Sequence, residues 1–157
     1  MTIQEYLHKI NDRYKLGIAT EHTYRGDLQS LLETLAPGIN VTNEPSRIEC
    51  GAPDYILSKG KIPVGYIEAK DVGKPLDSKE YKEQFDRYKK SLENLIITDY
   101  LDFQLFVEGQ PGPAVRIADT ERGRIVPRPE KYSEFEGLIK NFSMFTGQTI
   151  KSPATVV

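Results

Sequence analysis

Residues 64–70 constrain the fold of this chain more than any other segment, because they form a β-patterned run that is largely apolar and ends in charge. Side chains alternate between the two faces of a strand, so Glu68 and Lys70 point to one side and Ala69 to the other. At the end of such a strand, a turn residue is more common than a solvated charge. The segment therefore predicts a core strand with a polar site at its end.

A second β-patterned run, residues 55–58, precedes this strand, and Asp54 stands at its beginning. Residues 59–61, with Gly60 at the centre, supply a turn between the two runs. The two runs are therefore predicted to form a hairpin. A hairpin that turns at Gly60 brings the Asp54 carboxylate alongside Glu68.

Asp54, Glu68 and Lys70 together suggest phosphodiester chemistry. Two neighbouring carboxylates repel each other unless a cation lies between them, and hard oxygen ligands suit Mg²⁺ or Mn²⁺. An ammonium beside a metal and a phosphate can orient the attacking water, stabilise developing charge or act as a base. Taken alone, the trio is equally compatible with three solvated surface residues. Its place at the end of an apolar strand favours a site.

The remaining elements follow from hydrophobic periodicity. Helices are expected at residues 3–15, 20–35, 77–93 and 130–145. Strands are expected at residues 48–50, 55–58, 64–70, 95–98 and 103–107, with a turn at 109–113 and an outer hairpin of 115–117 with 124–126. The fold class predicted from this order is α/β, with a mixed β-sheet flanked by helices on both faces.

Composition limits the function classes. With 157 residues and 38% hydrophobic content, the chain fits one globular domain with its own core. One cysteine, no signal-like N-terminus and no apolar run of membrane-spanning length lead us to expect a cytoplasmic protein. A net charge of −2 is unusual for a stand-alone DNA-binding protein, so we expect any DNA binding to be local, metal-assisted or shared with other domains.

The helix at 77–93 carries Gln84 and Tyr88, four residues apart on one face. A glutamine among aromatic residues is costly unless it is hydrogen-bonded, which favours a role in a site. The order Asp54, Glu68-x-Lys70, Gln84-x-x-x-Tyr88 resembles the PD-(D/E)xK nuclease superfamily, in its branch with a glutamine–tyrosine motif. Over residues 1–146 the chain looks most like the N-terminal nuclease domain of type ISP restriction-modification enzymes, in the segments Glu21-His22-Thr23-Tyr24-Arg25, Gly51-Ala52-Pro53-Asp54 and Tyr66-Ile67-Glu68-Ala69-Lys70.

The resemblance implies a restriction-endonuclease-like core and Mg²⁺-dependent endonuclease activity on double-stranded DNA, with Mn²⁺ able to substitute. Asp54, Glu68 and the Ala69 carbonyl would bind the metal, and Lys70 would position or activate water. Gln84 and Tyr88 would orient the site or the phosphate. Family enzymes join this domain to a translocase, a methyltransferase and a target-recognition domain, so we expect residues 147–157 to be a linker towards such domains of a parent polypeptide.

Two residues of the helix at 20–35 have open roles. Glu21 is either a further carboxylate near the metal, as in many family members, or a charge that suits the positive end of the helix. Arg25 lies one turn later, where a pair with Glu21 is favoured over a phosphate contact.

Residues 59–90 hold nine Lys or Arg residues against six acids. Lys74, Lys82 and Arg87 are the candidate DNA-binding residues of this segment, although charge runs on helices are usually solvated faces.

Two other functions remain open. The same fold can serve as a catalytically idle module that binds DNA or docks onto partner domains, which the acidic net charge permits. A small α/β enzyme on another phosphorylated substrate would instead have a pocket around Glu68 that is too narrow for a duplex.

Overall fold

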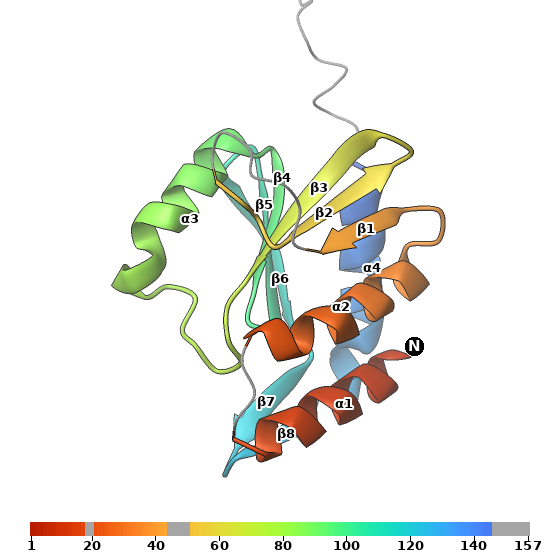
Figure 1. Cartoon of the computed structure of the whole chain (residues 1–157), viewed down its shortest axis with the longest axis vertical. Coiled ribbons are helices and arrows are strands. Elements are labelled where there is room, and N and C mark those ends of the chain that lie inside the picture. Colours follow the sequence, from red (N-terminus) through yellow and green to blue (C-terminus); the bar gives the residue numbers. More distant parts are fainter. Residues whose placement is uncertain (18–20, 44–50, 146–157) are drawn as a thin grey trace, which may run out of the picture.

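The computed structural model describes residues 1–17, 21–43 and 51–145, with only the backbone for residues 21–23. In these parts of the chain, a six-stranded sheet lies between helices on both faces (Figure 1). The helices are α1 (Ile3–Lys15), α2 (Glu21–Leu35), α3 (Lys79–Ser91) and α4 (Tyr132–Ser143), and a short 3₁₀ turn, η1 (Pro129–Lys131), precedes α4. The strands are β1 (Asn40–Asn43), β2 (Tyr55–Lys59), β3 (Ile62–Ala69), β4 (Asn94–Thr98), β5 (Asp102–Val107), β6 (Gln110–Arg116), β7 (Ala118–Glu121) and β8 (Arg124–Pro127).

The sheet is mixed, and its strands follow in chain order from β1 to β6. β3 and β4 are parallel, while the other neighbours in the sheet are antiparallel. Parallel neighbours need a crossover connection, and α3 provides it. The chain therefore leaves the charged end of β3, forms α3 over one face and returns as β4. This connection places α3 beside the end of β3.

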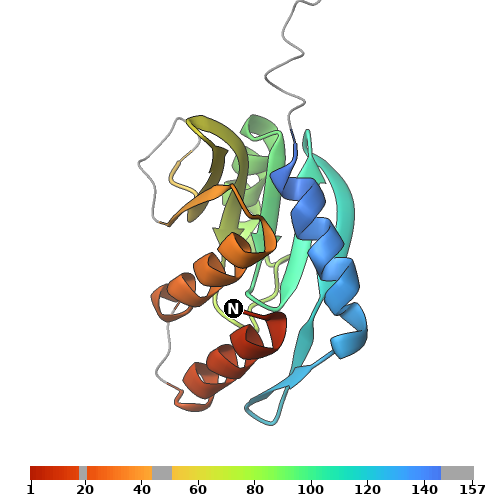
Figure 2. The ribbon, with the colours of Figure 1, turned by 90° about the vertical axis from the view of Figure 1, so that its right-hand side faces the viewer.

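Side-chain alternation along β3 and β4 separates two apolar layers. Ile67 and Ile96 lie in the main core, which α1, α2 and α4 cover with residues such as Leu32 and Phe135. Figure 2 shows α1, α2 and α4 along this side of the sheet. On the other face, Phe85 and Tyr88 of α3 and the following residue, Leu92, pack against Leu95, Ile97 and Phe106. The helices thus cover both faces, and the larger core lies on the side of α1, α2 and α4.

Gly65 allows α4 to approach the sheet closely. A Cβ atom at this position would come within 2.5 Å of the Phe142 ring and 3.0 Å of the Asn94 amide nitrogen. Both neighbours are buried, so they have little room to give way. A glycine is therefore needed at this point of β3 for packing, although glycine weakens a strand by itself.

The expected helices are all present, with ends that differ by a few residues. α1 begins at the predicted residue because Thr2 and Glu5 form a capping box, in which each side chain accepts a backbone N–H of the other. The expected strand at 48–50 lies outside the described residues. β1, which pairs with β2, was not predicted. Its polar sequence, Asn40-Val41-Thr42-Asn43, has little strand signal.

The predicted turn at 109–113 is wrong. The turn is confined to Glu108 and Gly109, which both have positive φ, and β6 begins at Gln110. Two residues of positive φ are typical of the tight loops that join antiparallel strands. The prolines that suggested a turn, Pro111 and Pro113, lie in a strand at the edge of the sheet, where a missing N–H is tolerated.

The predicted outer hairpin has the wrong first strand. Val115 and Arg116 belong to β6 and pair with β5, whereas the partner of β8 is β7. Arg122 and Gly123 form the β7–β8 turn, again with positive φ at both residues. Apolar alternation marks these short segments as strands, but it does not say which segments pair.

In the part of the chain that the structure describes, none of the helices combines the length and the apolar character needed to cross a membrane.

Candidate active site

The predicted β2–β3 hairpin is present and places Asp54 beside the end of β3. Tyr55 pairs with Ile67 in the antiparallel register, so Asp54, one residue earlier, lies opposite Glu68. The Asp54 carboxylate is buried, and its Oδ2 accepts a hydrogen bond of 2.8 Å from the Ala69 N–H. This bond ties the start of β2 to the residue between Glu68 and Lys70.

The Lys70 side chain contacts residues of both β3 and α3. Its Nζ lies 3.3 Å from Glu68 Oε2 and donates a hydrogen bond of 2.8 Å to Gln84 Oε1. The ammonium also lies 4.6 Å from the centre of the Tyr81 ring, a distance at which an aromatic face attracts a cation. The structure thus brings Asp54, Glu68, Lys70 and Gln84 to one place. Tyr81 joins them, as its position on the Gln84 face of the helix allows.

Arg25 reaches the site from α2, on the other face of the sheet. Its guanidinium pairs with Asp54 Oδ1, and both side chains are buried. The Tyr55 hydroxyl donates a hydrogen bond of 2.9 Å to the Arg25 carbonyl. Glu21 was the predicted partner of Arg25, and the pair with Asp54 was not predicted. The Glu21 side chain lies outside the described residues, so its role near a metal stays a prediction.

Tyr88 packs under the segment that leads into Asp54. It is buried in the α3 layer, and a Cβ atom on Gly51 would come within 2.9 Å of its hydroxyl. Gly51 also has a φ of 130°, which favours glycine. In the structure, Tyr88 therefore supports the chain segment that precedes Asp54. Its role in orienting a phosphate stays a prediction.

The three candidate DNA-binding residues are exposed. Lys74 lies in the connection between β3 and α3. Lys82 and Arg87 lie on α3, where Lys82 forms an ion pair of 2.6 Å with Asp86, and the Arg87 guanidinium carbon is 5.9 Å from the Tyr88 ring centre. That ion pair is solvated and has a small free energy. Their role in DNA binding stays a prediction.

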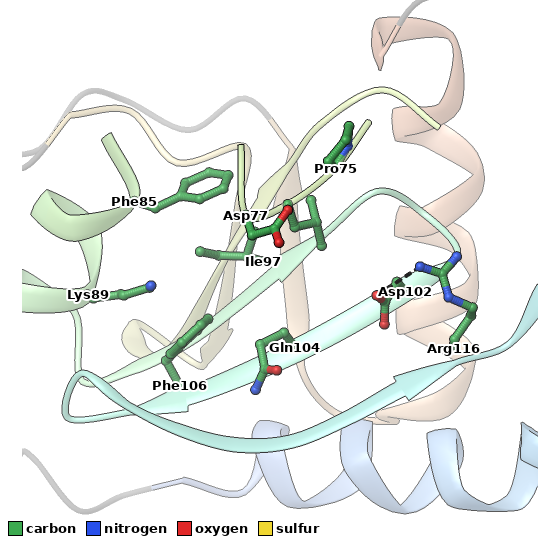
Figure 3. Close-up of a pocket in the computed structure, with 10 residues that line it drawn as sticks. Pro75, Asp77, Phe85, Lys89, Ile97, Asp102, Gln104, Phe106 and Arg116 are labelled. Atoms are coloured by element: carbon green, nitrogen blue, oxygen red, sulfur yellow. Dashed lines mark hydrogen bonds and ion pairs between the residues drawn. The ribbon is translucent and has the colours of Figure 1, made fainter. Parts of the chain in front are cut away.

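A pocket of about 530 Å³ adjoins this cluster on the α3 face (Figure 3). Phe85, Ile97 and Phe106 form apolar parts of its lining, while Lys89 and the Asp102–Arg116 ion pair contribute charge. Ile97 is the register partner of Glu68, and the Phe85 ring centre lies 5.8 Å from Lys70 Nζ. The pocket therefore extends from the cluster across β4 to β6.

Burial fixes the ionisation of the tyrosines behind the site. It raises the pKa of Tyr24 to about 12 and raises the pKa of Tyr55 well above its usual value. Both hydroxyls are therefore protonated at neutral pH. Tyr55 is thus a permanent hydrogen-bond donor to the Arg25 carbonyl.

The donor set partly fits a divalent metal. Asp54, Glu68 and the Ala69 carbonyl offer hard oxygen atoms of the kind that Mg²⁺ and Mn²⁺ prefer. Among the described residues, however, no group of three or more Asp, Glu, His or Cys side chains could hold a metal ion. The two carboxylates each have a cationic partner, Arg25 for Asp54 and Lys70 for Glu68. The two carboxylates and the carbonyl therefore suit a metal ion that takes only two side-chain ligands from the described residues.

Comparisons with known proteins identify the fold. Neither a protein-family model nor a curated protein matches this chain. Among solved structures, a chain of the cryo-EM structure of a DrdV–DNA complex matches with a TM-score of 0.66 and 23% sequence identity. The match covers 93% of this chain and 14% of that chain, so this chain spans a small part of its structural relative. The likeness confirms the expected fold class, a restriction-endonuclease-like α/β core with a mixed sheet between helices.

Proposed function

We propose that this chain is a metal-dependent endonuclease domain that hydrolyses DNA phosphodiester bonds. The observation that carries the proposal is the meeting of Asp54, Glu68 and Lys70 at the end of β3, with Gln84 bound to Lys70. The likeness to a protein solved with DNA supports the same substrate class. The site combines oxygen ligands, a fixed ammonium and an adjoining open pocket, which is what phosphodiester hydrolysis requires.

The chain's own residues have distinct tasks in this proposal. A divalent cation held by Asp54, Glu68 and the Ala69 carbonyl would act as a Lewis acid for the phosphate and provide a place for the attacking water. Lys70 places a positive charge beside that position, where it orients water and stabilises charge that develops on the phosphate. Gln84 fixes the Lys70 ammonium through the 2.8 Å hydrogen bond. Exposed Lys74, Lys82 and Arg87 would contact the DNA backbone.

The share of the solved relative that this chain covers supports a cleavage module within a longer enzyme. We propose partner domains that move along DNA, methylate it and recognise its target. In this view residues 1–146 are the nuclease domain, and the choice of cleavage sequence belongs to the other domains. The protein acts in the cytoplasm on double-stranded DNA.

DNA cleavage with Mg²⁺ by the parent enzyme tests the proposal. Asp54→Asn and Lys70→Ala should each lower the cleavage rate about 10³-fold, because such groups stabilise the transition state electrostatically. Lys9→Ala, an exposed lysine of α1, is the matched control and should leave the rate unchanged. Circular dichroism verifies that the variants fold. Wild-type rates in both site variants would refute the assignment.

A catalytically idle module of the same fold is the second candidate. The observation that favours it is the pairing of both carboxylates with cations. In addition, no group of three or more Asp, Glu, His or Cys side chains among the described residues could hold a metal ion. Such a module would bind DNA or dock onto partner domains without hydrolysis.

Calorimetric titration with Mn²⁺ in the presence of a DNA duplex separates the two candidates. The nuclease binds the ion through Asp54 and Glu68, so Asp54→Asn should abolish the heat that exceeds Mn²⁺ binding to the duplex alone. If the wild-type chain with DNA gives no metal-binding heat beyond that of the duplex alone, the idle module is the better description.

A further inference from the structure

Arg25 is held at the site from two directions by consecutive residues of the β2 segment. Its guanidinium pairs with the Asp54 carboxylate, and its carbonyl accepts the Tyr55 hydroxyl. Arg25 is 9% exposed and Asp54 is 7% exposed, so the ion pair is largely shielded from water. Asp54 and Tyr55 thus hold both the side chain and the backbone of Arg25 in place in the free protein.

The Asp54 oxygen atoms are already used in the free protein. Oδ1 faces the Arg25 guanidinium, and Oδ2 accepts the Ala69 N–H. A metal that uses Asp54 as a ligand approaches the same carboxylate and is repelled by the guanidinium. Arg25 and a metal therefore compete for Asp54.

The charges of the cluster give the same result. Asp54 and Glu68 are balanced by Arg25 and Lys70, so the four side chains have no net charge. These four side chains therefore offer a divalent cation no surplus negative charge among themselves, and an unbalanced positive charge in a buried place is unfavourable at low dielectric. A DNA phosphate and a hydroxide ion each bring one negative charge and would restore the balance.

We propose that Arg25 occupies the cation position at Asp54 in the free protein and passes to a DNA phosphate when metal and DNA bind together. A guanidinium suits this exchange because it pairs with carboxylate and phosphate in similar planar geometries. The inference rests on the proposed function, since it takes Asp54 as a metal ligand. Its consequence is that metal binding is weak without DNA, which keeps the site inactive until substrate arrives.

Calorimetric titration of the full chain with Mn²⁺ in the absence of DNA tests the inference. Arg25→Met keeps the apolar stem and removes the guanidinium, and it should bind Mn²⁺ about tenfold more tightly than wild type, within the usual range of coupling between sites. Arg13→Met is the matched control. Arg13 lies in α1 and forms an ion pair of 2.7 Å with Asp27, which belongs to α2, the helix of Arg25. This control variant should bind Mn²⁺ as wild type does.

Thermal unfolding keeps the test informative if Arg25→Met is less stable. Loss of Arg25 leaves the buried Asp54 charge without this partner, so Mn²⁺ should raise the melting temperature of Arg25→Met more than that of wild type. Wild type with a short duplex, whose integrity is checked on a gel, should bind Mn²⁺ more tightly than wild type alone. Equal or weaker Mn²⁺ binding by Arg25→Met, or an equal melting shift, would overturn the inference.

Asp54→Asn separates this inference from the proposed function. If wild type with DNA binds Mn²⁺ and Asp54→Asn does not, the metal site stands, and an unchanged affinity in Arg25→Met contradicts the role of Arg25 alone. If Mn²⁺ binds to none of wild type, wild type with DNA and Arg25→Met, the metal site itself is refuted, and the inference falls with it.

Discussion

On one face of the sheet, α1, α2 and α4 bury a continuous apolar layer, whereas on the other face α3 covers only part of the strands and leaves a pocket of about 530 Å³. The first layer contains large side chains with no exposed surface, such as Phe135 and Leu31. The second is a small group around Phe85 and Tyr88 that continues into the pocket. The polar cluster lies where the two regions meet, at the end of β3.

This difference shows how one sheet serves two needs. Close packing without voids gives stability but leaves no space for a ligand. An incompletely covered face costs dispersion energy but admits solvent and substrate. Because β3 contributes Ile67 to the closed layer and Glu68 to the open one, a rigid core holds the charged residues in place. We therefore expect substitutions on the two faces to affect different properties.

The largest stability effect should distinguish the two layers directly. Phe135→Ala removes a fully buried ring that packs at a tilt against Phe103, with 4.6 Å between ring centres, and it should lower the free energy of unfolding by about 3–5 kcal/mol. Phe85→Ala should cost less, because this ring already faces the pocket. Urea unfolding measures both, with exposed Glu136→Ala as the control. Equal losses for Phe135→Ala and Phe85→Ala would remove the distinction between the faces.

A smaller effect, on cleavage, is expected from the hydrogen bond between α3 and β3. Gln84→Met keeps the side-chain length but removes the acceptor for Lys70, and it should slow DNA cleavage about tenfold, since hydrogen bonds to charged groups contribute about 1.5–3 kcal/mol. Gln84→Glu restores an acceptor and should recover part of the rate. Exposed Glu83→Gln, on the same helix, is the control. A wild-type rate for Gln84→Met would mean that Lys70 does not depend on Gln84 for its position.

The smallest effect concerns pH and lies at the β4–β5 turn. Burial raises the pKa of Asp99, although hydrogen bonds from the Asp102 and Leu101 N–H groups act in the opposite direction. A carboxyl group with a higher pKa in the folded state stabilises the fold while protonated, and this contribution is lost as pH rises from about 4, the ordinary Asp value, through the raised pKa.

Asp99→Asn removes this titration, so the stability of the variant relative to wild type should increase with pH across that range. Urea unfolding of both proteins at several pH values measures the difference, with exposed Asp12→Asn as the control. A constant difference between wild type and Asp99→Asn would contradict the raised pKa.

The local parts of the site were predictable because backbone geometry sets them. Strand alternation places Glu68 and Lys70 on one side, where they form an ion pair, and helical spacing places Gln84 and Tyr81 near each other. The strand β6 was not predictable, because its prolines are typical of a turn. A strand tolerates them only at the edge of a sheet, and the position of β6 at the edge follows from the whole sheet. The same holds for β1, whose weak strand pattern is stabilised by its partner β2.

The amino-acid sequence alone determined the four helices, the hairpin that carries Asp54 to Glu68, and the side of β3 on which the charges lie. Periodicity and turn residues act over a few positions, so they can be recognised without knowing the rest of the fold. Only the tertiary structure decided that Arg25 pairs with Asp54, 29 residues away, and that α3 covers its face of the sheet only in part and leaves a pocket there. Those features depend on how α2 and α3 pack against the sheet, because contacts between distant segments are set by the shape of the whole core and not by local spacing.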